Sequence, residues 1–214
     1  MVDALVSILD KIINCVNIFL LPIITLLLVI KIKNEKSETG KYNIIRSLIC
    51  GCYACFSWLV IWEFIDENIP IGQTLHELIG NQSHTFGLFN FGYGIMVCLG
   101  LMMIVYANQK ETLYYTPIFI FSGMVIFYLL TGFQEWLMIY IYTGSVLGLL
   151  FLYITGFRLK DNGSLGIAIM FSLAFSTIFL QNTLLASIIS FGYIIFAIVF
   201  ALGYFEPFKE QEVN

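Results

Sequence analysis

The stretch Cys52-Tyr53-Ala54-Cys55 has the spacing of a thiol–disulfide exchange pair. An oxidoreductase of this kind passes its disulfide to a second pair, but Cys15 and Cys98 lie alone in different apolar runs. The pair also follows Arg46 closely, which places it toward the cytoplasmic end of its segment, away from the oxidising side. We interpret these cysteines as small apolar packing residues. Thiol redox activity at Cys52 and Cys55 and acylation near the cytoplasmic side are the alternatives, and we do not expect an enzyme.

A group of carboxylates follows the same segment, and both histidines of the chain lie in the loop beyond it. The carboxylates are Glu63, Asp66 and Glu67, and the loop adds His76, Glu77 and His84. Imidazole and carboxylate groups are ordinary ligands of divalent cations, yet this spacing matches no metal motif. We interpret the group as a solvated outer face, and we expect no metal site and no cofactor.

Asp10, Asn14 and Asn17 fall on one stripe of a helix, because their spacings are four and seven residues. Amides inside an apolar layer are costly unless they face other helices or a wet cavity. If this stripe faced Glu63 across the outer leaflet, the four side chains would form a polar vestibule. Asp10, Asn14, Asn17 and Glu63 are therefore our candidate ligand-binding residues, with hydrogen bonding between helices as the alternative.

Charged groups are missing from the middle of the later apolar runs, and this excludes several functions. Ion-coupled transporters and proton pumps usually need such groups near the membrane midplane. Haem needs a ligand such as histidine within a span, and a nucleophilic hydrolase needs a base there. Lys is absent between residues 161 and 208, so the last run lacks a lysine for a retinal Schiff base.

What remains inside is small, hydroxylic or aromatic. Gly144-x-x-x-Gly148, Ala168-x-x-x-Ser172 and Ala197-x-x-x-Ala201 are patterns of close helix packing. Serine and threonine recur through the later runs, where they either bond back to helix carbonyls or line a cavity for a neutral or lipophilic ligand.

The composition places these residues in a membrane. The chain has 214 residues, of which 59% are hydrophobic and 11% are charged, and its mean hydropathy is +0.90. A soluble domain is only about 45–50% apolar and about 25% charged. Nothing resembles a nucleic-acid-binding patch. The first residues lack a basic start and a small-residue cleavage site, so we expect the first helix to be retained.

Seven apolar runs are long enough to cross a bilayer as helices. The predicted spans are residues 12–30, with Pro22 as a kink, 47–66, 87–107, 117–134, 136–156, 164–181 and 183–205. The junctions after the fourth and sixth spans are tight. The loop at 67–86 contains Thr74-x-x-Glu77, a capping-box pattern, and we expect a short amphipathic helix there, on the outer surface.

The basic residues test this count. With seven spans, nine of the ten fall on one side of the membrane: Lys31, Lys33, Lys36, Lys41, Arg46, Lys110, Arg158, Lys160 and Lys209. Short loops rich in Lys and Arg stay cytoplasmic. The sequence therefore predicts an all-α, polytopic seven-transmembrane-helix bundle, a single domain over residues 1–214, with its N-terminus outside and its C-terminus inside.

Three functions fit such a bundle. The first is a channel or carrier for a small uncharged solute in the cell membrane. The second is a receptor-like module that senses a ligand, and the third is a non-catalytic subunit of a membrane complex. The expected partners are the lipid bilayer, a small neutral or lipophilic ligand, and a second copy or another membrane protein. No nucleic acid is expected.

Overall fold

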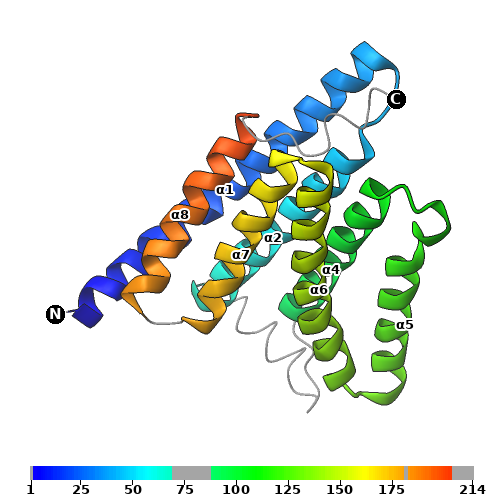
Figure 1. Cartoon of the computed structure of the whole chain (residues 1–214). Helices are drawn as coiled ribbons and strands as arrows, with labels where there is room; N and C mark the ends of the chain where they lie inside the picture. Colours follow the sequence, from blue (N-terminus) through cyan, green and yellow to red (C-terminus); the bar gives the residue numbers. More distant parts are fainter. Residues whose placement is uncertain (1, 69–87, 181–182, 204–214) are drawn as a thin grey trace.

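The computed structural model describes residues 2–68, 88–180 and 183–203. This part of the chain contains seven α-helices, one short 3₁₀ helix and no strand. The elements in chain order are α1 (Val2–Thr39), α2 (Ile44–Asn68), α4 (Leu88–Ala107), η1 (Glu111–Leu113), α5 (Thr116–Thr131), α6 (Glu135–Leu159), α7 (Asn162–Phe179) and α8 (Leu184–Ala201) (Figure 1). The all-α prediction is confirmed.

Five helical segments are long and apolar enough to cross a bilayer. They are Lys11–Thr39, Ile44–Trp62, Glu111–Thr131, Glu135–Leu159 and Leu184–Ala201. Phe91–Ala107 and Asn162–Leu173 are shorter apolar helices. The structure therefore has the character of a membrane-embedded protein, while the count of seven crossings and the orientation remain predictions.

The first helix is longer than predicted. Its 38 residues make a rod about 57 Å long, whereas the hydrocarbon layer is about 30 Å thick. The helix runs through Pro22 without interruption. It continues past the apolar run to Thr39, and in this extension Glu35 forms an ion pair with Arg46 of α2. It ends at Gly40, whose φ of 72° places it in the left-handed region that glycine favours.

The connectors explain why several predicted boundaries were wrong by a few residues. The span 117–134 was predicted too long, because Gly132 has a φ of 73° and its N–H bonds to the Tyr128 carbonyl at 2.8 Å, which ends α5. Helix α7 begins earlier than predicted because the Asp161 carboxylate accepts the Ser164 backbone N–H at 3.0 Å as an N-cap. Thr183 caps α8 in the same way. The tight junction between α5 and α6 is confirmed.

Six helices form a closed ring in the order α1, α2, α4, α6, α7 and α8, and α8 returns to α1. Helix α5 lies outside the ring against α4 and α6. Consecutive helices alternate in direction, so the start of α1 and the end of α8 lie at opposite ends of the bundle (Figure 1). The core inside the ring is apolar: Leu21, Ile24 and Leu59 are almost completely buried.

Small residues let these helices approach closely. A Cβ added at Gly144 of α6 would lie 2.5 Å from Val97 Cγ1 of α4. Ala168 of α7 and Ala197 of α8 are both fully buried. The predicted close-packing patterns therefore coincide with contacts between helices.

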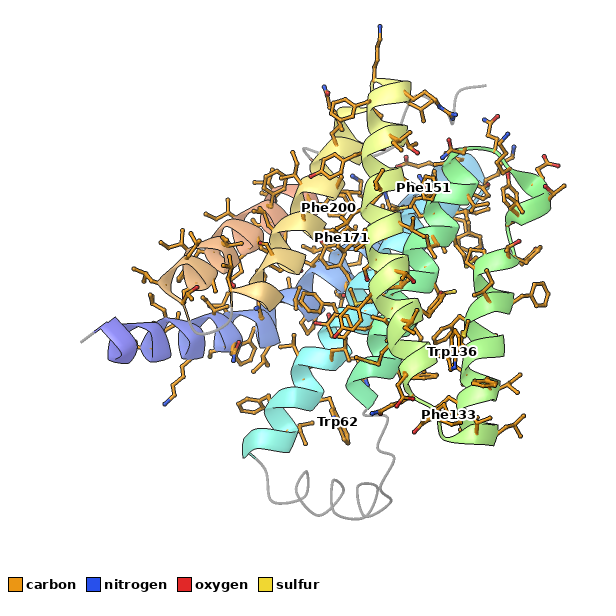
Figure 2. All side chains as sticks on the ribbon, turned by 60° about the horizontal axis from the view of Figure 1, so that its bottom comes forward. Trp62, Phe133, Trp136, Phe151, Phe171 and Phe200 are labelled. Atoms are coloured by element: carbon orange, nitrogen blue, oxygen red, sulfur yellow. The ribbon has the colours of Figure 1, made fainter. Side chains whose placement is uncertain are left out.

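Aromatic residues gather at the end of the bundle opposite the lysine-rich end of α1. Trp62, Phe133 and Trp136 lie there together in Figure 2, from α2 and the α5–α6 connector region. The Trp58 and Trp62 rings stack with centroids 6.1 Å apart, so they share one face of α2. Rings of this kind favour the headgroup level of a bilayer.

Candidate functional site

The predicted polar vestibule is described only in part. Asn14 of α1 is exposed, and Asn17 is half-buried with its side-chain Oδ1 enclosed and without a hydrogen-bond partner in the described structure. Asp10 lies in α1 and Glu63 in α2, but their side chains are outside the described residues. The vestibule therefore remains a prediction.

The pairing of α1 with α2 shows which of these positions share a level. Glu35 pairs with Arg46, Thr25 lies 3.2 Å from Ser57 between hydroxyl oxygens, and the Cys50 thiol donates to the Thr25 carbonyl. These contacts join the two helices in opposite order, as antiparallel helices require. Continued in that order, position 17 of α1 falls beside the last part of α2, which contains Glu63.

The acidic residues and histidines that we interpreted as a solvated outer face lie largely outside the described side chains. Asp66 and Glu67 lie in the last turn of α2, and their side chains are outside the described residues. His76, Glu77 and His84, together with the capping box at Thr74, lie in the undescribed segment 69–87. Within residues 2–68, 88–180 and 183–203, no three His, Cys, Asp or Glu side chains gather as metal ligands would.

Cys50 and Cys52 pack between helices. All five cysteines are free, with Cys15 exposed, Cys50, Cys52 and Cys98 buried and Cys55 half-buried. The Cys52 thiol donates to the Met96 carbonyl of α4 at 3.9 Å, and Cys50 reaches the Thr25 carbonyl of α1 at 3.7 Å. These contacts are the packing role expected from the sequence. Redox activity of Cys52 and Cys55 stays an untested prediction.

A small cavity lies inside the ring. Four helices line it, through Cys52, Tyr53 and Phe56 of α2, Met96 of α4, Met170 and Phe171 of α7, and Tyr193 of α8. It measures about 10 Å³, whereas a site for a drug-sized ligand needs about 300–1,000 Å³. The space is close to the roughly 10–15 Å³ that one water molecule requires.

The cavity lies at the middle of every helix that lines it. The central residue of α2 is 56, and the midpoints of α4, α7 and α8 fall beside residues 97, 170 and 192. In a bundle that spans a bilayer, this level is the membrane midplane.

Aromatic contacts and one hydrogen bond order the cavity wall. The Tyr53 hydroxyl donates to Met170 Sδ at 3.0 Å, and the Tyr53 ring stacks on Phe200 with centroids 5.8 Å apart. Phe56 meets Tyr193 edge to face at 5.9 Å. Figure 2 shows Phe171 and Phe200 between the ribbons of the bundle. No charged side chain lines the cavity.

The hydroxyls proposed as a cavity lining mostly bond to their own helices. Thr131, Thr143, Ser145, Ser172 and Ser176 each donate to a carbonyl one turn earlier, and none of them lines the cavity. Thr131 and Thr143 are exposed on the outside of the bundle. The alternative in which hydroxyls satisfy helix carbonyls is therefore correct for these residues.

Sequence reasoning missed most of the cavity residues. Of its lining, only Cys52 was singled out, and for different chemistry. The available signal was the pair of phenols, Tyr53 and Tyr193, at the middle of apolar runs, where a hydroxyl needs a partner. Comparison with known proteins found no similar protein family, no similar curated protein and no similar solved structure.

Proposed function

We propose that all seven helices cross one bilayer, with the N-terminus outside and the C-terminus in the cytoplasm. The alternating helix directions and the position of the lysine-rich end of α1 support this proposal. Arg46 at the start of α2 and Arg158 at the end of α6 belong to the same end as the lysines of α1. Helices α7 and α8, at 18 residues each, are about 27 Å long, close to the hydrocarbon thickness.

Within this arrangement we propose a carrier for a small uncharged solute in the cell membrane. The observation that carries the proposal is the cavity at the midplane of a closed ring, lined by four helices and by no charged group. Binding sites of membrane carriers lie at this level, between groups of helices that move against each other. An uncharged wall favours a cargo that crosses without a counter-ion.

A carrier fits the packing better than an open channel does. In the described residues the interior is filled by aromatic and aliphatic side chains, and the cavity has a volume of only about 10 Å³, close to the space that one water molecule needs. The described structure then corresponds to a contracted state, and binding a solute requires the helices around the cavity to separate.

A flux assay in liposomes tests this function. The purified chain is reconstituted and challenged with urea, glycerol and a short-chain alcohol, and solute entry is followed by light scattering against protein-free vesicles. Met170→Phe fills the cavity and should reduce any flux at least tenfold. Leu150→Phe, at an exposed apolar position of α6, is the matched control and should leave flux unchanged.

Two results would overturn the carrier proposal. One is entry no faster than in protein-free vesicles for every solute, and the other is equal flux in the two phenylalanine variants. Saturable solute binding without flux would favour the ligand-sensing alternative.

A further inference from the structure

Three sulfur-bearing residues line the midplane cavity, each from a different helix. They are Cys52 of α2, Met96 of α4 and Met170 of α7. Cys52 and Met96 are neighbours across the α2–α4 contact, because the Cys52 thiol reaches the Met96 carbonyl. Met170 approaches from α7, where its sulfur meets the Tyr53 hydroxyl. Three of the seven residues that line this small space therefore carry sulfur.

The chemistry of this wall is soft. Thiolate and thioether sulfur select Cu⁺ and similar d¹⁰ ions, whereas carboxylate and carbonyl oxygen select Mg²⁺ or Ca²⁺. The other lining residues are Tyr53, Phe56, Phe171 and Tyr193, and none carries a carboxylate or an imidazole. We propose that this cavity binds one soft monovalent metal ion, Cu⁺ or Ag⁺, through the sulfur atoms of Cys52, Met96 and Met170.

Charge balance selects a monovalent ion. A bare ion at the centre of a low-dielectric bundle is very costly. When the ion binds, the Cys52 S–H bond breaks, a sulfur–metal bond forms, and the proton leaves to the buffer. One positive charge replaces another, so the site stays neutral, and no electron moves because the metal is supplied as Cu⁺ or Ag⁺. Zn²⁺ would leave a net charge of +1.

The size of the cavity also selects an ion. Its volume of about 10 Å³ excludes an organic ligand in the described conformation but has the scale of a single atom. Methionine has three rotatable bonds and a polarisable sulfur, so Met96 and Met170 can adjust to an ion without moving their helices. The Tyr53 hydroxyl orients the Met170 sulfur, and the sulfur keeps a second lone pair for the metal.

Metal binding and solute transport are separate claims. Metal binding is measured on the full chain purified in detergent, where no transport takes place. The carrier proposal can therefore be refuted while the metal site is supported, and the metal site can be refuted while the carrier proposal is supported.

Silver binding by titration calorimetry tests the site. The measurements use the full chain with Cys15→Ser and Cys55→Ser, which removes the two cysteines that are not buried. We expect one Ag⁺ per chain and no binding of Zn²⁺. Cys52→Ala should abolish binding at this site, and Met96→Leu or Met170→Leu should weaken it at least tenfold. Met103→Leu is the matched control, because Met103 is buried in the core but does not line the cavity. This variant should bind Ag⁺ as tightly as the background, which is the chain that carries only Cys15→Ser and Cys55→Ser.

Two further readouts separate metal binding from loss of folding. The unfolding temperature should rise with Ag⁺ in the background and in Met103→Leu, but not in Cys52→Ala. X-ray absorption of the unsubstituted chain loaded with one Cu⁺ should show a shell of sulfur atoms only. Binding that is unchanged in both cavity methionine variants would overturn the proposal, and so would a Cu⁺ shell containing nitrogen or oxygen.

Discussion

Two glycines on α6 face α4 one helical turn apart, and they offer a matched pair of substitutions. A Cβ at Gly144 would lie 2.5 Å from Val97 Cγ1, whereas a Cβ at Gly148 would lie 3.9 Å from the nearest atom, Leu101 Cδ2. The first distance is a clash and the second is an ordinary van der Waals contact. Gly144→Ala and Gly148→Ala therefore make the same chemical change against different packing.

The expected difference follows from these distances. Both substitutions gain about 1 kcal/mol of helix propensity. At position 148 nothing opposes the gain, so Gly148→Ala should be neutral or stabilising by up to about 1 kcal/mol. At position 144 overpacking costs about 1–3 kcal/mol. Val97 cannot turn aside cheaply, because a valine in a helix has one strongly preferred rotamer. The two variants should therefore differ by about 1–3 kcal/mol.

Unfolding in mixed micelles with increasing SDS measures this difference. Gly144→Ala should unfold at a lower SDS fraction than Gly148→Ala. A double-mutant cycle adds the mechanism: Val97→Ala removes the clashing Cγ1, so Gly144→Ala should cost less in that background. Equal unfolding of the two alanine variants would refute the reasoning, as would a Gly144→Ala effect that Val97→Ala leaves unchanged.

Three more predictions concern the ends of the helices. Asn108 joins α4 to α6: its amide N–H donates to the Thr155 hydroxyl at 3.0 Å, and its carbonyl oxygen accepts from Arg158 at 2.5 Å. Asn108→Ala should therefore lower the free energy of unfolding by about 1–3 kcal/mol in the same SDS titration. A loss no larger than that of the exposed control Asn34→Ala would contradict this. Asp161→Ala removes the N-cap of α7 and should lower the free energy of unfolding by about 0.5–2 kcal/mol, whereas Asp161→Ser should retain much of the capping stability. Thermal unfolding followed by circular dichroism compares the two variants, and equal melting temperatures would contradict the capping role. For the orientation, Ser37→Cys and Lys160→Cys should resist a membrane-impermeant maleimide in intact cells, whereas Phe133→Cys should react; labelling of positions 37 and 160 from opposite faces would refute the seven crossings.

Helix positions followed from the sequence because long apolar runs have few structural alternatives in a bilayer. The ends of the helices were predicted less accurately than their positions, because they depend on local backbone chemistry such as the left-handed conformation of Gly132 and the N-cap at Asp161. The extension of α1 to Thr39 brings Glu35 to Arg46 of α2, a contact that only the pairing of two helices reveals.

The cavity could not be predicted, because its wall combines the centres of four helices that are far apart in the chain. Spacing within one span shows which residues share a face, but it does not say which faces meet. Tyr53 and Met170 are 117 residues apart and form a hydrogen bond. The candidate residues Asp10, Asn14, Asn17 and Glu63 were chosen from polarity and from helical spacing within a span, which indicate a need for partners without identifying them.

The contact between α1 and α8 has a consequence for biosynthesis. Because α1 leaves the ribosome before α8, the face of α1 that contacts α8 stays uncovered until α8 has been made. Until then the half-assembled bundle has an open seam, which lipids or an insertion chaperone must shield. Nonsense mutations that delete α8 should therefore give a protein that inserts into the bilayer but is degraded by membrane quality control.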